Sequence, residues 1–483
     1  VPWHPPGLRR KKRTASGGFM SRTLLGVVGA MALVGWGCGD ESAASSGGGG
    51  DPTGGEVSFH RDVEPILQKS CLGCHYEGQI GGFSLLSYEE AAPMAGFIAA
   101  VTEDRRMPPW GAQTTDECEP RLPYKDDLRL SDEEIATLRA WADQGAPKGD
   151  PADAPPPFQL VPESLAEVDV ELTPGEPSIV QGDRDDFVCV IYDPALTEEK
   201  WIDGIHFVPG NLTVAHHALT FRADRDDMLA ASGGAERFPC FGGTPGAVIH
   251  AWAPGGNPYE LPSKVGIKLK PEEVLVVQMH YHPTGDSIEE DASTLQLSYA
   301  DTTPDWQFVV TFPGNASNAG DGLLPGPNDR NGVPEFFIPA GVKDHTEEMV
   351  IRVPDEIFID LPILMVMSHM HYVGVDLKVE VERATLNASQ PQNECFLHTP
   401  AWDFNWQRFY QFDVPIEQLP TAKAGDILRI SCKFDNSMEN PYLRDALEAE
   451  GMSAPVDVFL GEETLDEMCL APMGVLVPAG IDI

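Results

Sequence analysis

Basic side chains are scarce in this sequence. Lys and Arg together number 33, against 75 Asp and Glu, which gives a formal net charge of -42. A surface this acidic repels the phosphate backbone of DNA or RNA. We therefore expect no nucleic-acid partner, although the charge itself names no substrate.

The N-terminal region contains no apolar run long enough to cross a bilayer. Thirteen small and apolar residues, Leu24 to Trp36, follow a basic RRKKR segment. A transmembrane helix needs about 20 such residues, so this pattern predicts a signal peptide. We expect residues 1–50 to be a signal peptide and flexible tether of a protein exported to the periplasm or surface of a bacterium. Gly37-Cys38 resembles a lipoprotein cleavage site, so Cys38 is expected to attach the chain to a membrane through lipid; cleavage without lipid is the alternative.

Long helical patterns are also absent after residue 162. Short β-type runs such as FVCVIY, WQFVVTF and ILRISCKF are separated by Gly, Pro, Asn and Asp, which favours antiparallel sandwiches. The chain of 483 residues is too long for one ordinary core. We expect a mainly β protein with two jelly-roll-like sandwiches, preceded by a small α-helical domain. The expected boundaries are a Pro-rich linker at 151–162 and β subdomains at 163–315 and 316–483.

The motif Cys71-Leu-Gly-Cys74-His75 is typical of covalent haem attachment. In CxxCH the two thiols bond to the haem vinyl groups, and the histidine ligates the iron. No further ligands are spaced for structural zinc. A helix-like EPILQKS precedes the motif, and an N-capped amphipathic pattern lies at 130–147. Residues 57–150 resemble the small cytochrome c domains fused to periplasmic oxidoreductases, which implies one covalent haem c.

Met107 is the expected second axial ligand of that haem. It lies in RRMPPWG, where Pro108 and Pro109 hold the chain extended beside a thioether. Met94 is the alternative, but its small-residue surroundings favour helix packing. Thioether ligation raises the potential of the haem iron, which suits electron transfer.

Histidines in the β region occur in three short motifs. Adjacent strand residues face opposite ways, so a His-His doublet can share one ion only through a β-bulge or through different ring nitrogens. Residues i and i+2 share a face, so an HxH pair within the apolar strand-like run 364–374 could bind one ion. The alternative is a set of hydrogen-bonded structural histidines. The motifs are TVAHHALTF with His216 and His217, QMHYH with His280 and His282, and SHMHY with His369 and His371.

Met468 in LDEMC adds a soft ligand candidate. Two imidazoles with a thioether favour copper over zinc, because sulfur stabilises Cu(I). His282 is expected either to support its neighbour His280 or to face solvent. The remaining histidines of this region are expected to be structural: His206, His250, His345 and His398.

These motifs resemble the copper type II, ascorbate-dependent monooxygenases. In that family an adjacent His pair and the His of a QxHY strand hold one copper, and an HxH pair and the Met of DEMC hold the other. The resemblance assigns the first copper to His216, His217 and His280, and the second to His369, His371 and Met468. It places Gln278 in the catalytic site, together with the second copper's ligands. It also implies a disulfide between Cys432 and Cys469; the pairing of Cys118, Cys189, Cys240 and Cys395 stays open.

Three positions depart from the peptide-amidating member of the family. Its carboxylate-binding Arg, Asn and Tyr are replaced here by Met367, Leu470 and Pro472. A buried carboxylate would be left unpaired beside these apolar groups, which argues against peptide amidation. The resemblance then implies hydroxylation of a C–H bond of a small, uncharged or apolar substrate with O2.

Electrons for this reaction are expected from an external donor, either an ascorbate-like reductant or a redox protein. Our hypothesis is that the haem relays them to the copper at His216, His217 and His280. Two other classes of function remain open. The first is a haem and copper electron-transfer or copper-sensing module without hydroxylase activity. The second is a substrate-binding surface lipoprotein with structural histidines.

Overall fold

The computed structural model describes residues 56–481 apart from 78, 80, 160–163, 183–184, 241–242, 254–255, 257, 286, 387–389, 405, 462 and 464. The expected signal peptide, tether and lipidated Cys38 lie outside these residues. Within the described part, none of the helices combines the length and the apolar character needed to cross a membrane.

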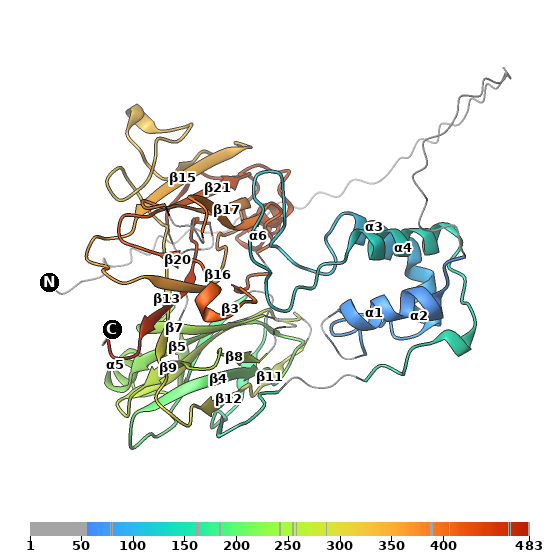
Figure 1. The fold of residues 1–483 in the computed structure, drawn as a ribbon, viewed down its shortest axis with the longest axis horizontal. Helices are drawn as coiled ribbons and strands as arrows, with labels where there is room; N and C mark the ends of the chain where they lie inside the picture. Colours follow the sequence, from blue (N-terminus) through green and yellow to red (C-terminus); the bar gives the residue numbers. More distant parts are fainter. Residues whose placement is uncertain are drawn as a thin grey trace, which may run out of the picture. The chain divides into compact units, whose positions relative to one another are not determined.

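A small helical region precedes the β region, as expected (Figure 1). Ser131 and Glu134 form a capping box at the start of the last helix, which confirms the helix expected at 130–147. Its buried Leu138 and Trp141 pack with Phe59 and Leu67 in a separate apolar cluster. The helices are α1 (Glu64–Ser70), α2 (Tyr88–Ala91), α3 (Ala95–Glu103) and α4 (Asp132–Asp143).

The first β-sandwich packs the N-terminal half of a large sheet against a five-stranded sheet. The rings of Phe207 and Trp252, from opposite sheets, lie 5.0 Å apart. In order, the large sheet here runs β1 (Val170–Leu172), β12 (Thr294–Tyr299), β4 (Lys200–Val208), β9 (Val265–Leu269) and β13 (Trp306–Thr311), with β8 (Tyr259–Glu260) beside β4. The five-stranded sheet runs β6 (Arg237–Pro239), β3 (Asp186–Tyr192), β10 (Glu273–Tyr281), β5 (Ala215–Asp224) and β7 (Ala247–Trp252).

The second sandwich continues the same large sheet. Strand β13 pairs antiparallel with β23, so one sheet runs through both sandwiches. The continuation is β23 (Met473–Pro478), β16 (Leu361–Val366) and β19 (Tyr410–Gln411), with β20 (Thr421–Ala422) beside β16. The facing sheet runs β15 (His345–Arg352), β21 (Ile427–Phe434), β17 (Gly374–Glu382) and β18 (Asn393–Thr399).

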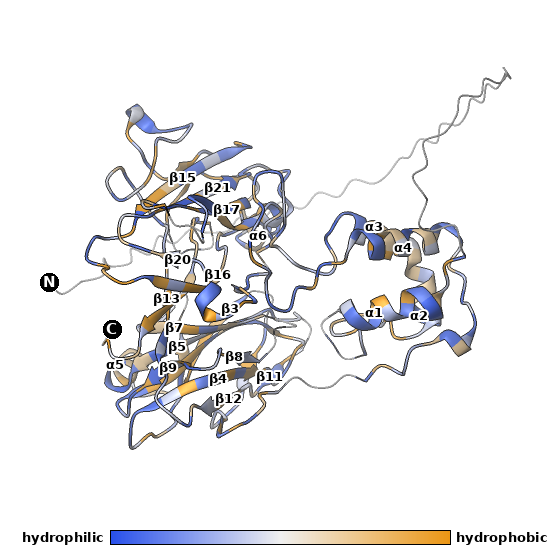
Figure 2. Cartoon of the chain, in the orientation of Figure 1, coloured by the Kyte–Doolittle hydropathy of each residue, from blue (hydrophilic) through white to orange (hydrophobic). Residues whose placement is uncertain are grey.

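The remaining elements are short. They are the pairs β2 (Ser178–Val180) with β11 (Glu289–Asp291) and β14 (Phe337–Ile338) with β22 (Val458–Phe459), and the helices α5 (Arg225–Ala231) and α6 (Pro441–Ala449). Nearly all strand pairs are antiparallel, with β9 and β13 parallel. Hydrophobic and hydrophilic residues interleave along the strands (Figure 2), as expected when one face of each sheet is buried. The mainly β, antiparallel fold predicted from the sequence is confirmed.

Three disulfides link six of the cysteines in the described part of the chain. Cys432 and Cys469 are bonded, as the family resemblance implied. The pairing that the sequence left open is Cys118 with Cys395 and Cys189 with Cys240. Cys71 and Cys74 take part in none of these bonds.

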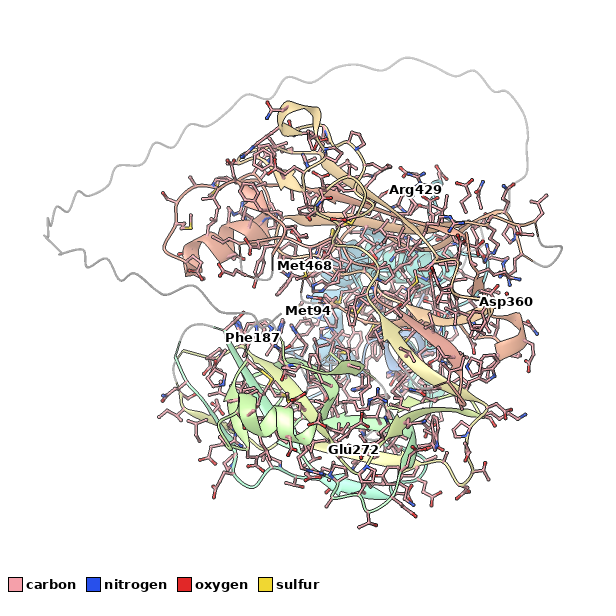
Figure 3. All side chains as sticks on the ribbon, turned by 90° about the vertical axis from the view of Figure 1, so that its left-hand side faces the viewer. Met94, Phe187, Glu272, Asp360, Arg429 and Met468 are labelled. Atoms are coloured by element: carbon pink, nitrogen blue, oxygen red, sulfur yellow. A yellow bond between two sulfur atoms is a disulfide. The ribbon has the colours of Figure 1, made fainter. Side chains whose placement is uncertain are left out.

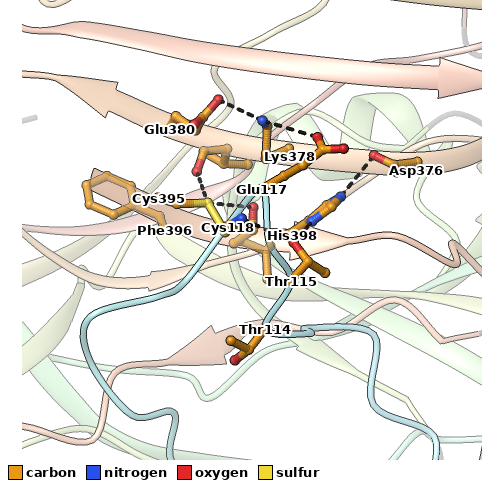
Figure 4. Close-up of a disulfide and its surroundings, with 12 residues drawn as sticks. Thr114, Thr115, Glu117, Cys118, Asp376, Lys378, Glu380, Cys395, Phe396 and His398 are labelled. Carbon is orange, nitrogen blue, oxygen red and sulfur yellow. Dashed lines mark hydrogen bonds and ion pairs between the residues drawn. A yellow bond between two sulfur atoms is a disulfide. The ribbon is translucent and has the colours of Figure 1, made fainter. Parts of the chain in front are cut away.

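Residues 110–128 lie against the second sandwich, although they fall within the stretch expected to form the haem domain. The Cys118–Cys395 disulfide joins this segment to β18 (Figure 4). Beside it, Thr115 Oγ1 lies 2.8 Å from Nδ1 of His398. Trp110 and Tyr124 are buried in the β core. The CxxCH motif is thus followed by a segment that is fixed to the β region.

Candidate metal centres

The doublet on β5 and the histidine of β10 meet at one point. His217 lies opposite His280, whereas Ala215 lies opposite Tyr281, so His216 is the extra residue of a β-bulge. Nδ1 of His280 is 3.2 Å from Nδ1 of His216 and 3.3 Å from Nδ1 of His217. The bulge turns two adjacent histidines to the same side, which is one of the two solutions expected from the sequence.

This N-terminal cluster has the character of a transition-metal site. Ligand nitrogens of His216, His217 and His280 all lie within 4.8 Å of one another. Burial, with the neighbouring imidazoles, holds the pKa of His217 well below its ordinary value, so the ring is neutral and able to donate to a metal. His280 also stacks on Phe187, with ring centroids 4.3 Å apart.

Asp185 supports this cluster, and sequence reasoning missed it. Its carboxylate oxygens lie 2.8 Å from Nε2 of His280 and 2.7 Å from Nδ1 of His282. A carboxylate on the far nitrogen fixes a ligand's tautomer and raises its basicity. The DRDD stretch around Asp185 carries no local pattern that would have singled it out. His282 is exposed and also supports Asp185, so the structure combines the two roles considered for it.

Gln278, expected in the catalytic site, lies on the same β10 strand but makes a structural contact. Its buried side-chain nitrogen donates to the carbonyl of Cys240, 2.7 Å away. Cys240 is joined to Cys189 on β3, so this hydrogen bond ties the disulfide to the strand that carries His280. A catalytic role for Gln278 stays a prediction.

The HxH pair lies just beyond a strand. Strand β16 ends at Val366, so the expectation that 364–374 is one continuous strand is wrong for the residues after Val366. His369 instead pairs with Leu470 through two backbone hydrogen bonds of 3.0 Å. The imidazoles of His369 and His371 have centroids 5.4 Å apart and are nearly perpendicular. Because the strand ends at Val366, the HxH segment leaves β16 and runs beside the segment that contains Met468.

The segment that carries Met468 runs alongside the HxH pair. The backbone N–H of His371 donates to the carboxylate of Glu467, the residue before Met468. On its other side the segment contacts Gly314, whose positive φ of 124° and lack of a side chain allow close approach to the carbonyl of Cys469. Figure 3 labels Met468 on the second sandwich and Phe187 on the first. Backbone pairing therefore brings the segment that contains Met468 alongside His369 and His371, and a shared metal for these three residues stays a prediction.

Glu467 holds this arrangement from inside. The carboxylate is fully buried and accepts four backbone N–H groups, those of His371, Val373, Gly374 and Met468. Burial raises the pKa of Glu467 to about 8, while the four N–H donors act in the opposite direction. The glutamate of the DEMC motif is thus a structural anchor for both the HxH turn and the methionine.

Nitrogen partners define which atoms face the second centre. Nδ1 of His369 lies 2.6 Å from Oε1 of Gln407, and Nδ1 of His371 lies 3.0 Å from the carbonyl of Asp466. Both Nδ1 atoms are therefore occupied, which leaves Nε2 as the ring nitrogen available to a metal. Burial lowers the pKa of His369 to about 4, so its ring is neutral.

The loop between β18 and β19 contacts both histidine clusters. The ring of Phe404 lies edge-on to His217, with centroids 6.4 Å apart, and to His371, with centroids 6.5 Å apart. The same loop supplies Gln407 and Trp402, whose indole N–H donates to the carbonyl of His371. No sequence motif marks this loop, because its role depends on the approach of the two sandwiches.

The other histidines have local partners, as expected for structural residues. In the β region, His345 lies 2.6 Å from Glu347, and His398 lies 3.2 Å from Asp376. His206 lies near Gln296, and His250 near Thr220.

Comparison with known proteins gives one distant relative. The chain is 26% identical over 274 residues to DBH-like monooxygenase protein 2 of Mus musculus, covering 54% of this chain and 38% of the mouse protein. The chain thus spans less than two fifths of the relative's length. This similarity supports a relationship to the copper type II monooxygenases. No family model matches the chain.

The similarity of this fold to solved structures is low. The major capsid protein P2 of bacteriophage PM2 matches with a TM-score of 0.25 and 9% identity, covering 64% of this chain and 97% of that one. The VP2 subviral particle of infectious bursal disease virus matches with a TM-score of 0.17 and 10% identity, covering 66% and 75%. Likeness this low carries no inference about function.

Proposed function

We propose that this protein is a two-copper monooxygenase that hydroxylates a C–H bond of a small, uncharged or apolar substrate with O2. The observation that supports it best is the bulge that gathers Nδ1 of His216, His217 and His280 at one point. Copper bound there and at the second centre would supply one-electron redox chemistry with O2. The chain's own residues hold the imidazoles in fixed orientations and keep them neutral. Protons then do not compete with the metal for the ring nitrogens.

The donor sets fit copper. Three imidazoles at the first centre suit copper or zinc, and a thioether beside two imidazoles at the second favours copper. The second centre uses Nε2 of His369 and His371, since both Nδ1 atoms are hydrogen-bonded. We assign Met468 as the third ligand there, because its segment pairs with the HxH segment.

The surroundings of the second centre suit an apolar substrate. Met367 and Leu470 are buried, and the backbone N–H of Met367 donates to the carbonyl of Pro472, 2.8 Å away. The three positions where the peptide-amidating enzyme carries carboxylate-binding groups therefore lie together beside His369, and all are apolar. A carboxylate placed here would lose water without gaining a partner.

A covalent haem c at Cys71, Cys74 and His75 is the second part of the proposal. Backbone hydrogen bonds from Cys74 and His75 to the carbonyl of Cys71 place the three side chains on one helical turn. Nδ1 of His75 is buried without a hydrogen-bond partner, and the exposed Phe83 lies against the ring, with centroids 4.4 Å apart. Apolar surface and a half-buried imidazole beside two thiols fit a porphyrin. Haem c would supply one-electron transfer.

The test combines metal analysis with product detection. Purified protein should contain about two copper and one iron per chain, and should incorporate one atom of ¹⁸O₂ into product with a reductant present. Met468→Ile should retain the first copper but lose product formation. Met473→Leu, a buried methionine on β23, is the matched control and should remain active. Full copper with oxygen uptake but no product would contradict the hydroxylase, and absence of copper would indicate structural histidines.

A further inference from the structure

We propose that Arg408 and Trp110 bind a propionate carboxylate of the haem attached at Cys71 and Cys74. This inference rests on the proposed haem. It assigns a haem-binding residue to the copper-type β region, and it places the haem beside the loop that supports the second metal centre.

Arg408 is a largely buried cation without an ion pair in the described part of the chain. Its guanidinium lies 4.7 Å from the centre of the Trp110 ring and 6.0 Å from that of Tyr410. Its Nε atom is buried and has no hydrogen-bond partner. Asp126 and Asp127 both act to raise the pKa of Arg408, but in the described part of the chain neither forms an ion pair with it, and Asp127 is bonded to Arg129. Buried charges in proteins are normally paired, so Arg408 lacks an expected partner.

Trp110 is the second unsatisfied donor at this place. The side chain is buried in the β core, and its indole Nε1 has no hydrogen-bond partner. A buried tryptophan N–H usually finds an acceptor. Neither an indole N–H nor a guanidinium can accept a hydrogen bond, so a ligand shared by Trp110 and Arg408 must be an acceptor. A carboxylate satisfies both donors and also neutralises the charge.

The proposed haem would be a source of such a carboxylate. Trp110 follows Met107, the expected axial ligand, by three residues, which limits their Cα separation to about 10 Å. Arg408 also lies close enough to Cys74 for the thiol to influence the pKa of the guanidinium. Haem c carries two propionates, so a haem bonded to Cys74 brings a carboxylate into this neighbourhood.

A soluble carboxylate substrate is the competing source. Arg408 also lines a cavity of about 110 Å³ together with Gln407, His250 and Tyr259. Trp110 does not line that cavity, so its unsatisfied N–H is not explained by a ligand there. A haem propionate would accept from both Trp110 and Arg408, whereas a ligand in the cavity would not reach Trp110. The haem propionate is therefore the favoured partner.

The test measures the midpoint potential of the haem in the full-length protein between pH 5 and 8. Arg408→Gln should lower the potential, because a positive charge that favours the reduced haem is removed. It should also make the potential pH-dependent, because the propionate then titrates nearer neutrality. Trp110→Phe keeps the ring and removes the N–H, so it should produce a smaller shift in the same direction. Arg429→Gln, which breaks only a surface ion pair with Glu348, should leave the potential unchanged.

Covalent haem is quantified by pyridine haemochrome, and folding by the urea midpoint. Haem-loaded Arg408→Gln and Trp110→Phe with the wild-type potential and pH profile would overturn this inference alone. A wild-type protein without haem would overturn the haem proposal as well. Added acetate that binds through Arg408 while the potential stays fixed would assign the site to a soluble carboxylate and reject the propionate.

Discussion

Oδ2 of Asp185 lies 2.8 Å from Nε2 of His280, on the side of the ring opposite the nitrogen that faces His216 and His217. The carboxylate would therefore act on the proposed N-terminal metal centre through His280. Asp185 is a positioning residue for this centre.

Replacing Asp185 with Asn should weaken copper binding at the N-terminal centre by about 10- to 100-fold, because the ligand loses its fixed orientation and part of its basicity. Competition titration with a Cu(I) chelator would measure this in a His369→Ala background, where only that centre remains. Asp186→Asn is the control, since Asp186 is the next residue and is exposed at the start of β3. Equal affinities for the two variants would exclude a positioning role.

Phe404 should influence both centres at once. Its ring contacts His217 and His371 edge-on, and such aromatic contacts are each worth about 0.5–1.5 kcal/mol. Phe404→Ala should therefore change the electron paramagnetic resonance signal of Cu(II) in both a His369→Ala and a His217→Ala background. Phe358→Ala, which removes a ring that is 90% exposed, should change neither. A response in only one background would show that the ring supports a single centre.

The disulfides should differ in their contribution to stability. Cys118 and Cys395 are 277 residues apart, whereas Cys189 and Cys240 are 51 apart. Loop-closure entropy predicts that removing the longer link costs about 1.5 kcal/mol more. Urea unfolding of the two double Cys→Ser variants measures this difference. The opposite order would mean that local packing around Cys189 outweighs the entropy of the unfolded chain.

Glu347 should make stability depend on pH. Burial raises the pKa of Glu347 above its ordinary 4.5, although its contact with His345 acts the other way. The folded state therefore keeps a proton that the unfolded chain releases, and the free energy of unfolding falls as pH rises above about 4.5.

Glu347→Gln cannot ionise, so its stability relative to wild type should increase with pH, by about 1.4 kcal/mol for each unit of the original pKa shift. Urea unfolding at pH 4.5 and 7.5 measures the change. Glu348→Gln, at the exposed neighbouring position, is the control. A constant difference between Glu347→Gln and wild type would contradict the prediction.

Much of the fold was predictable because short β-type runs are separated by turn-forming residues in the sequence. FVCVIY lies within β3, and ILRISCKF is the whole of β21. The bulge at His216 was foreseeable as one of two solutions, since adjacent strand residues cannot otherwise share a ligand. The end of β16 at Val366 was not, because MVMSHMHY remains apolar after the strand has stopped.

Contacts between segments far apart along the chain could not be predicted from the sequence. Asp185, Gln407 and Phe404 act through partners far along the chain, and nothing local distinguishes them from other loop residues. The pairing of Cys118 with Cys395 likewise depends on where residues 110–128 pack. The periodicity of one sequence indicates which face of a strand or helix is buried, but it does not indicate which other segment covers that face.

The loop from Trp402 to Tyr410 meets His371, His217, His369 and Trp110 through successive side chains. A graft of either histidine cluster onto another scaffold would therefore have to include the whole loop. Exchanging its tip would disturb two centres and the anchorage of the N-terminal segment together. Among natural homologues, substitutions at different positions of this loop should therefore occur together.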